Sequence, residues 1–182
     1  MNYNDLLSSI FAEHIELHSV CASTAMPQIS LASEAIANCL LRDKKILSCS
    51  SNSGSYLAQM FCSHLLGGHD EERPALPAIY LNKDHSGDIA KKVNAIGSEG
   101  DTLVMFACES DDALIAAIHS ARQRNICIIL CTNSDMLIAQ LSELDIAIAL
   151  PVASSIRSLE MQTTIIHALC QLIDNHIFGG TA

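Results

Sequence analysis

A serine-rich turn holds the residues best suited to binding a small ligand. Cys49-Ser50-Ser51-Asn52-Ser53-Gly54-Ser55 places four hydroxyls and one amide between an apolar run and a helical pattern. Such residues at a helix N-terminus suit an anion, because the first backbone N–H groups of a helix have no partner within it. The same residue types are also ordinary helix caps. An anion site and a plain cap therefore both remain interpretations of this turn.

A second polar cluster follows a later apolar run and is strongly acidic. Its sequence is Cys108-Glu109-Ser110-Asp111-Asp112. The Ser110 hydroxyl could join the serine turn around a ligand, but each carboxylate within about 6 Å of an anion costs roughly 3 kcal/mol at an effective dielectric near 20. Acids in the first turn of a helix also suit its dipole without any ligand. We therefore expect this cluster to repel an anion.

The last helical pattern carries polar side chains at helical spacing. They form one stripe that must face a cleft or water: Glu160, Thr164, His167, Gln171 and Asp174. Because histidine titrates near neutral pH, His167 could serve as a general base. A lone histidine is more often a hydrogen-bonded structural residue, so both interpretations stay open.

The elements that position these residues follow from hydrophobic periodicity. Five apolar runs, at 46–49, 78–81, 103–107, 126–131 and 146–150, alternate with helical patterns at 55–66, 86–97, 111–124, 134–142 and 155–178. Uniformly apolar runs that alternate with helices indicate a parallel sheet buried on both faces. We predict a single α/β domain over 1–182, with a doubly wound five-stranded parallel sheet in 43–182 and a long C-terminal helix. Two helices in 1–42, separated near Pro27, should pack on this core and between subunits.

Composition excludes several classes of protein. The formal charge of −10 and the lack of any Lys/Arg cluster argue against direct nucleic-acid binding. No apolar run reaches the roughly 20 residues of a membrane span, and the N-terminus does not resemble a signal peptide, so we expect a cytoplasmic protein without membrane contact. The eight cysteines lie mostly in apolar runs without a Cys-x-x-Cys pair, which indicates buried thiols.

Four stretches resemble the sugar isomerase (SIS) domain family, and within it the phosphoheptose isomerases and the replication-initiator-associating proteins. They are the serine turn, Glu72-Arg73-Pro74-Ala75-Leu76-Pro77-Ala78-Ile79, Gly97-Ser98-Glu99-Gly100-Asp101-Thr102-Leu103 and Leu172-Ile173-Asp174-Asn175. The resemblance covers nearly the whole chain. It implies a flavodoxin-like sheet, a homotetramer, and a sugar phosphate cradled by the serine turn and by the loop after the third strand.

The sequence departs from the isomerases at several positions. The acidic cluster replaces the second phosphate-binding loop, and Lys83–Asp88 replaces a longer loop that lines the family's pocket. His167 and Glu160 match the family's last-helix histidine and glutamate. The resemblance pairs that histidine with a glutamate on the helix after the first strand, and His64 stands at that position here. Some relatives bind zinc near these positions, yet Met60 and Leu159 stand where further ligands would be. We predict no cofactor and no metal, with zinc as the less favoured alternative.

Three functional hypotheses follow. The first is a non-catalytic protein that acts through protein contacts, as the initiator-associating proteins do, with Ile177 and Phe178 matching the leucine-phenylalanine pair of that subgroup. The second is a phosphoheptose isomerase that uses His167 and Glu160 on sedoheptulose 7-phosphate. The third is a sensor that binds a carbohydrate derivative without turnover through the hydroxyls and amide of the two loops: Ser51, Asn52, Ser53, Ser55 and Ser110.

Overall fold

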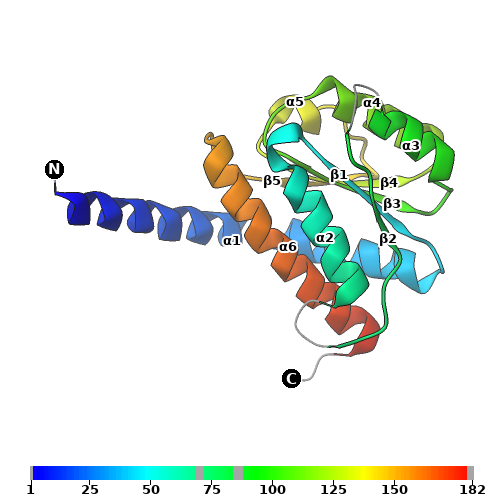
Figure 1. Ribbon diagram of the computed structural model, residues 1–182, viewed down its shortest axis with the longest axis horizontal. Helices are drawn as coiled ribbons and strands as arrows, with labels where there is room; N and C mark the ends of the chain where they lie inside the picture. The colour runs from blue at the N-terminus through cyan, green and yellow to red at the C-terminus, as the bar shows by residue number, and fades with distance from the viewer. Residues whose placement is uncertain (1, 69–71, 84–87, 180–182) are drawn as a thin grey trace.

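The computed structural model describes residues 2–68, 72–83 and 88–179, and its centre is one parallel sheet (Figure 1). The sheet order is β2-β1-β3-β4-β5. The strands are β1 (Ile46–Ser50), β2 (Ala78–Tyr80), β3 (Thr102–Ala107), β4 (Cys127–Thr132) and β5 (Ile146–Ala149). All five predicted strands are confirmed, with each end within one residue of the prediction. The chain order reverses between β1 and β3, and ligands of such sheets bind beyond the strand ends at this switch point.

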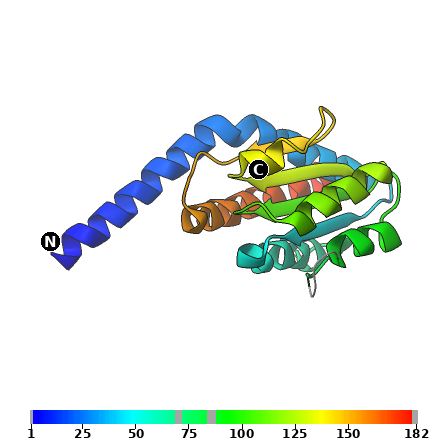
Figure 2. The ribbon, with the colours of Figure 1, turned by 90° about the horizontal axis from the view of Figure 1, so that it is seen from above.

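Helices cover both faces of the sheet, as Figures 1 and 2 show. One face carries α1 (Tyr3–Leu41), α2 (Ser55–Gly67) and α6 (Ser155–Phe178), and the other carries α3 (Asp88–Ile96) and α4 (Asp112–Gln123). Side chains alternate along each strand, so Val104 and Phe106 of β3 belong to the first core, whereas Leu103 and Met105 belong to the second. The predicted doubly wound α/β architecture is therefore confirmed.

The prediction of two N-terminal helices is wrong, because α1 is one continuous helix with Pro27 inside it. Proline removes a backbone N–H and usually kinks or ends a helix. Here one buried stripe continues through the proline, with Cys21 and Ala25 before it and Ala32 and Ile36 after it. Packing on both sides holds the helical path, and Figure 2 shows α1 bending where it joins the body of the domain.

The predicted helix at 134–142 is shorter than expected. Helix α5 covers only Asp135–Ile138, and the next residues form tight turns in which Gln140 N–H donates to Leu137 O at 3.0 Å. The predicted start of the helix at 86–97 lies partly outside the described residues, where α3 begins at Asp88. None of the described helices combines the length and the apolar character that a bilayer crossing requires.

The apolar circumference of the last helix is covered mostly by its own chain. Ile165, Ile166, Leu169, Cys170 and Ile173 are all buried within the same core as α1 and α2. Exposed large apolar side chains are concentrated instead on the first half of α1, among them Tyr3, Leu7, Phe11 and Ile15.

The cysteines are buried free thiols, as predicted. Seven of the eight are buried and Cys127 is partly exposed. Burial raises the pKa of the Cys62 thiol to about 12 and raises that of Cys131 well above its ordinary value, because a low-dielectric surrounding disfavours the thiolate.

We expect an aromatic disulfide reagent at pH 8 to label Cys127 first in the folded protein. The thiolate is the reactive species, and because burial raises the pKa of Cys127 as well, the lead of Cys127 rests on its greater exposure to the reagent. All eight thiols should react once the chain is unfolded in guanidinium. Rapid labelling of several thiols in the folded state, followed by mass spectrometry of the peptides, would contradict this expectation.

Candidate functional site

The serine turn and the loop after β3 lie side by side at the switch point of the sheet. Ser50 of β1 is opposite Phe106 of β3, and Ser51 N–H donates to Phe106 O at 3.0 Å. The Ser51 hydroxyl accepts a hydrogen bond from Cys108 N–H at 3.3 Å, and Ser51 is fully buried. The Ser51 side chain therefore joins the two loops to each other.

A carboxylate of the second loop is hydrogen-bonded to the serine turn. The Ser53 hydroxyl donates to Glu109 Oε1 at 3.1 Å, and its oxygen lies 3.5 Å from that of Ser51. Asn52 and Ser55 are exposed in the same turn, where a short 3-10 helix, η1 (Asn52–Gly54), leads into α2. The Ser53 hydroxyl, which could donate to a bound anion, therefore donates to the Glu109 carboxylate of the same chain.

The remaining acids of the second loop have other partners. Asp111 caps α4 by accepting from Ala113 N–H at 2.9 Å, and Lys83 Nζ lies 2.5 Å from its Oδ2. Asp112 is exposed in the first turn of α4, and the Ser110 hydroxyl is directed to Met136 Sδ at 3.2 Å. Of the three carboxylates that the sequence places near the serine turn, only Glu109 is hydrogen-bonded to it.

A buried glutamine connects α6 to the strand ends, and sequence reasoning missed it. Gln162 is fully buried, and its Nε2 donates to Ala107 O at 3.3 Å and to Ser158 Oγ at 2.8 Å. Ser158 Oγ in turn donates to Asn133 Oδ1 at 3.1 Å. The sequence signal that could have found it is the position of Gln162 among the apolar residues of the last helix, where a polar side chain needs a buried partner. This network fixes α6 over the loops that follow β3 and β4.

The two predicted catalytic residues of α6 lie in different surroundings. The ring of His167 is 5.3 Å from that of His64 on α2, measured between centroids. Glu160 lies two helical turns away, where its Oε2 contacts Arg157 Nη1 at 2.9 Å and His14 Nδ1 at 3.2 Å. Seven residues of helix separate Glu160 and His167 by roughly 10 Å along the axis. Glu160 therefore holds α1 to α6 and does not pair with His167.

Within the part of the chain that the structure describes, no group of zinc ligands gathers around the histidine pair. Structural and catalytic zinc ions take three or four protein ligands. Met60 and Leu159, at the positions where further ligands were expected, pack against the apolar core. Across residues 2–68, 72–83 and 88–179, no three side chains among His, Cys, Asp and Glu lie close enough together to hold a metal ion.

The tip of α6 is held by a buried arginine. Arg73 Nε lies 2.7 Å from Asp174 Oδ1, and Nη1 donates to Leu65 O at 2.8 Å. The same guanidinium lies 5.6 Å from the ring centroid of Phe178. Phe178 is 42% exposed, whereas Ile177 is partly buried against the core. Of the predicted contact pair, Ile177 thus belongs to the packed fold, and Phe178 presents the accessible ring.

Comparison with known proteins agrees with this fold. A phosphoheptose isomerase of Methylococcus capsulatus is 31% identical over 98% of this chain and 100% of its own length. The DnaA initiator-associating protein DiaA of Yersinia pestis is 30% identical over 94% of this chain and 95% of its own length. A solved phosphoheptose isomerase of Francisella tularensis matches with a TM-score of 0.89 and 30% identity, covering 96% of this chain and 100% of that one. No model of a known protein family matches the sequence.

The five-stranded parallel sheet in this order, with helices on both faces, defines the class of α/β fold that the solved relatives share. The chain belongs to the sugar isomerase (SIS) domain family, in the branch that contains phosphoheptose isomerases and DiaA. The family resemblance predicted from the sequence is confirmed. Most of the relatives named here are isomerases, and one is an initiator-associating protein.

Proposed function

We propose that this chain is a non-catalytic SIS-domain protein that acts through protein contacts. The observation that supports it most is the hydrogen bond between Ser53 and Glu109. Relatives named phosphoheptose isomerase act on a phosphorylated sugar, and a dianionic phosphate at this turn would meet the Glu109 carboxylate. Like charges this close repel each other.

The arrangement of the acid–base residues supports the same proposal. Moving a proton between neighbouring carbons of a sugar needs a base and an acid beside the substrate. His167 faces another histidine, and Glu160 is held by Arg157 and His14. Glu160 is therefore engaged away from His167, and His64 stands at the position of the glutamate that the family resemblance pairs with this histidine.

We expect no measurable conversion of sedoheptulose 7-phosphate. The assay is a coupled or chromatographic measurement of the heptose 7-phosphate product, with an active phosphoheptose isomerase as positive control. His167→Ala serves as the matched variant, because any genuine turnover at this site needs that imidazole. Turnover by the wild type that disappears in His167→Ala would refute the non-catalytic proposal and support the isomerase.

The partner proposed for this chain is the replication initiator protein. Support comes from the relative named DnaA initiator-associating protein and from the exposed ring of Phe178 at the tip of α6. The formal charge of −10 favours a protein partner over nucleic acid. In a cytoplasmic homotetramer, four such rings would let weak contacts add through avidity.

We expect Phe178→Ala to weaken capture of purified initiator protein by at least about tenfold, because aromatic anchors dominate interfaces of this kind. Leu144→Ala is the matched control, since Leu144 is 88% exposed, precedes α6 and lies 34 residues before Phe178 in the chain. Both variants should keep the oligomeric mass of the wild type. Full-strength capture by Phe178→Ala in surface plasmon resonance would refute this contact.

A carbohydrate-binding sensor is the second candidate, favoured by the exposed side chains of Asn52 and Ser55 beside the turn. A ligand at 100 times its dissociation constant adds about 2.7 kcal/mol of stability. A melting scan against neutral sugars and sugar phosphates tests this directly. A rise in melting temperature with one class of compound would favour the sensor over the contact protein.

A further inference from the structure

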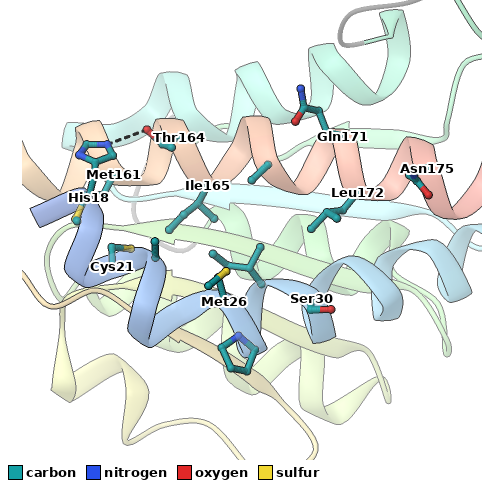
Figure 3. Close-up of a pocket in the computed structure, with 14 residues that line it drawn as sticks. His18, Cys21, Met26, Ser30, Met161, Thr164, Ile165, Gln171, Leu172 and Asn175 are labelled. Atoms are coloured by element: carbon teal, nitrogen blue, oxygen red, sulfur yellow. Dashed lines mark hydrogen bonds between the residues drawn. The ribbon is translucent and has the colours of Figure 1, made fainter. Parts of the chain in front are cut away.

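Two pockets open along α1, and their linings differ in kind. The groove between α1 and α6, drawn in Figure 3, is walled mainly by apolar side chains. The pocket at the C-terminal end of α1 is polar, and its volume of about 530 Å³ suits a small molecule. We call it the basal pocket, because it lies where β3 and β4 begin, at the end of the sheet opposite the serine turn. Its polar lining residues are Asn38, Arg42, Lys44, Glu99, Asp101, Thr102 and Asn125.

The segments that wall the basal pocket are joined to each other by hydrogen bonds. Gly100 N–H donates to Asn125 O at 3.3 Å. Cys127 N–H donates to Asp101 O at 3.2 Å, so the turns before β3 and β4 hold each other in place. The Cys39 thiol of α1 donates to Gly100 O at 3.5 Å. The fold itself therefore shapes the pocket, as it does in most small-molecule sites.

The basal pocket collects cations that have no partner in the chain. Seven Lys and Arg side chains form an ion pair or donate a hydrogen bond to the protein: Lys45, Arg73, Lys83, Lys92, Arg122, Arg124 and Arg157. Among the described residues, the side chains of Arg42, Lys44 and Lys91 form neither, and the first two of these line the pocket. The chain has twenty acids for ten bases, so a shortage of acids does not explain the unpaired cations.

The backbone around Arg42 and Lys44 holds both residues at the pocket. Arg42 follows the last turn of α1, where its backbone N–H donates to Cys39 O at 3.2 Å. The stem of Lys44 lies against Gly100, since a Cβ added to that glycine would be 3.2 Å from Lys44 Cε. Gly100 has a φ of +86°, which other residues rarely adopt, so this close approach depends on glycine.

The two acids that line the pocket do not neutralise these cations. Asp101 is 1% exposed, and Lys45 Nζ lies 2.6 Å from its carboxylate, so that charge is already balanced. Glu99 is exposed, and it forms no ion pair or hydrogen bond with the residues that the structure describes. Solvent screens an exposed carboxylate. Two cations against one screened acid give the pocket a positive excess within a chain of formal charge −10.

We propose that the basal pocket binds a small organic oxyanion, a carboxylate or a phosphate ester, through Arg42 and Lys44. Guanidinium and ammonium groups form charge-assisted hydrogen bonds with both kinds of oxyanion. The side-chain amides of Asn38 and Asn125 add uncharged donors to the lining. This site is separate from the serine turn and involves neither Glu109 nor the tip of α6, so it goes beyond the proposed function.

Cys127 can report whether the pocket is filled, because its partly exposed thiol lines it. The probes are citrate and inorganic phosphate at tens of millimolar, with ionic strength held constant by sodium chloride. A neutral maleimide should alkylate Cys127 more slowly in their presence, as measured by mass spectrometry of the labelled peptide. A probe at about nine times its dissociation constant leaves about a tenth of the pockets free, so the rate should fall by about tenfold. Protection by citrate alone would identify a carboxylate ligand, and protection by phosphate alone a phosphate ester.

Substitution of the cations separates binding in the pocket from a general effect of the anion. Arg42→Gln/Lys44→Gln should abolish the protection of Cys127. Lys91→Gln is the matched control, because it removes the unpaired cation of α3, which does not line the pocket, and it should keep the protection. Glu99→Gln should lower the probe concentration needed for half protection by several-fold, because it removes a charge that repels the ligand.

The alternative is that the two cations only complement the negative end of the α1 dipole, which needs no ligand. In that case neither probe slows the alkylation of Cys127 in the wild type, and this result would overturn the proposal. Equal protection in the wild type and in Arg42→Gln/Lys44→Gln would overturn it as well. Either result leaves the proposed function standing, since the assay depends on neither Glu109 nor Phe178.

Discussion

Asp101→Ala is expected to lower the free energy of unfolding by about 3–5 kcal/mol. The Asp101 carboxylate is 1% exposed and accepts from Lys45 N–H at 3.1 Å, Lys45 Nζ at 2.6 Å and Ser98 N–H at 2.8 Å. Its removal leaves backbone donors unpaired in a buried place and Lys45 without its counter-charge. Each of these losses is costly in a low-dielectric surrounding.

Urea unfolding at one fixed protein concentration measures this effect, because an oligomer's apparent stability depends on concentration. Asp112→Ala is the matched control: it removes an exposed acid from the first turn of α4 and should cost less than about 1 kcal/mol. Asp101→Asn keeps one acceptor oxygen, so its loss in the free energy of unfolding should lie between those of the two alanine variants. Equal urea midpoints for Asp101→Ala and Asp112→Ala would show that the hydrogen bonds of Asp101 do not stabilise the turn before β3.

The sheet was predictable because each strand is buried on both faces. Residues of β3 alternate between the two cores, so the whole run from Leu103 to Ala107 is apolar. Such runs can be located without knowing what they contact. The path of α1 was not predictable in this way, because a local rule for Pro27 competes with a buried stripe that exists only after α6 and β5 have packed.

The sequence also does not show which polar side chains contact each other at the candidate site. Lys83 and Asp111 are 28 positions apart, and Ser53 and Glu109 are 56 apart. Which acid meets which loop depends on backbone directions after β1 and β3, and composition does not encode those directions. The sequence placed the acidic loop beside the serine turn correctly, but it did not distinguish Glu109, which is hydrogen-bonded to the turn, from Asp111, which Lys83 neutralises.

Glu109→Ser is expected to increase the affinity for a sugar phosphate by about 10- to 100-fold. Two unit charges 6 Å apart repel by about 0.7 kcal/mol in water and about 3 kcal/mol at an effective dielectric of 20. Glu109 is exposed, so solvent screens part of this repulsion, but the phosphate carries nearly two charges at neutral pH. Serine also returns a hydroxyl to a loop whose backbone already joins the turn through Ser51 and Cys108.

Isothermal titration with sedoheptulose 7-phosphate measures this change, and inorganic phosphate serves as a second probe. Asp112→Ser is the matched control, because it removes the same charge from the same loop at a residue that is not hydrogen-bonded to the turn. The gain should appear only in Glu109→Ser, and it should shrink as salt is raised, since screening weakens the repulsion that the wild type retains. Equal affinities for the wild type and Glu109→Ser would show that Glu109 does not close the site. Weak binding of the sugar phosphate would then be caused by the direction of the backbone N–H groups in the serine turn itself.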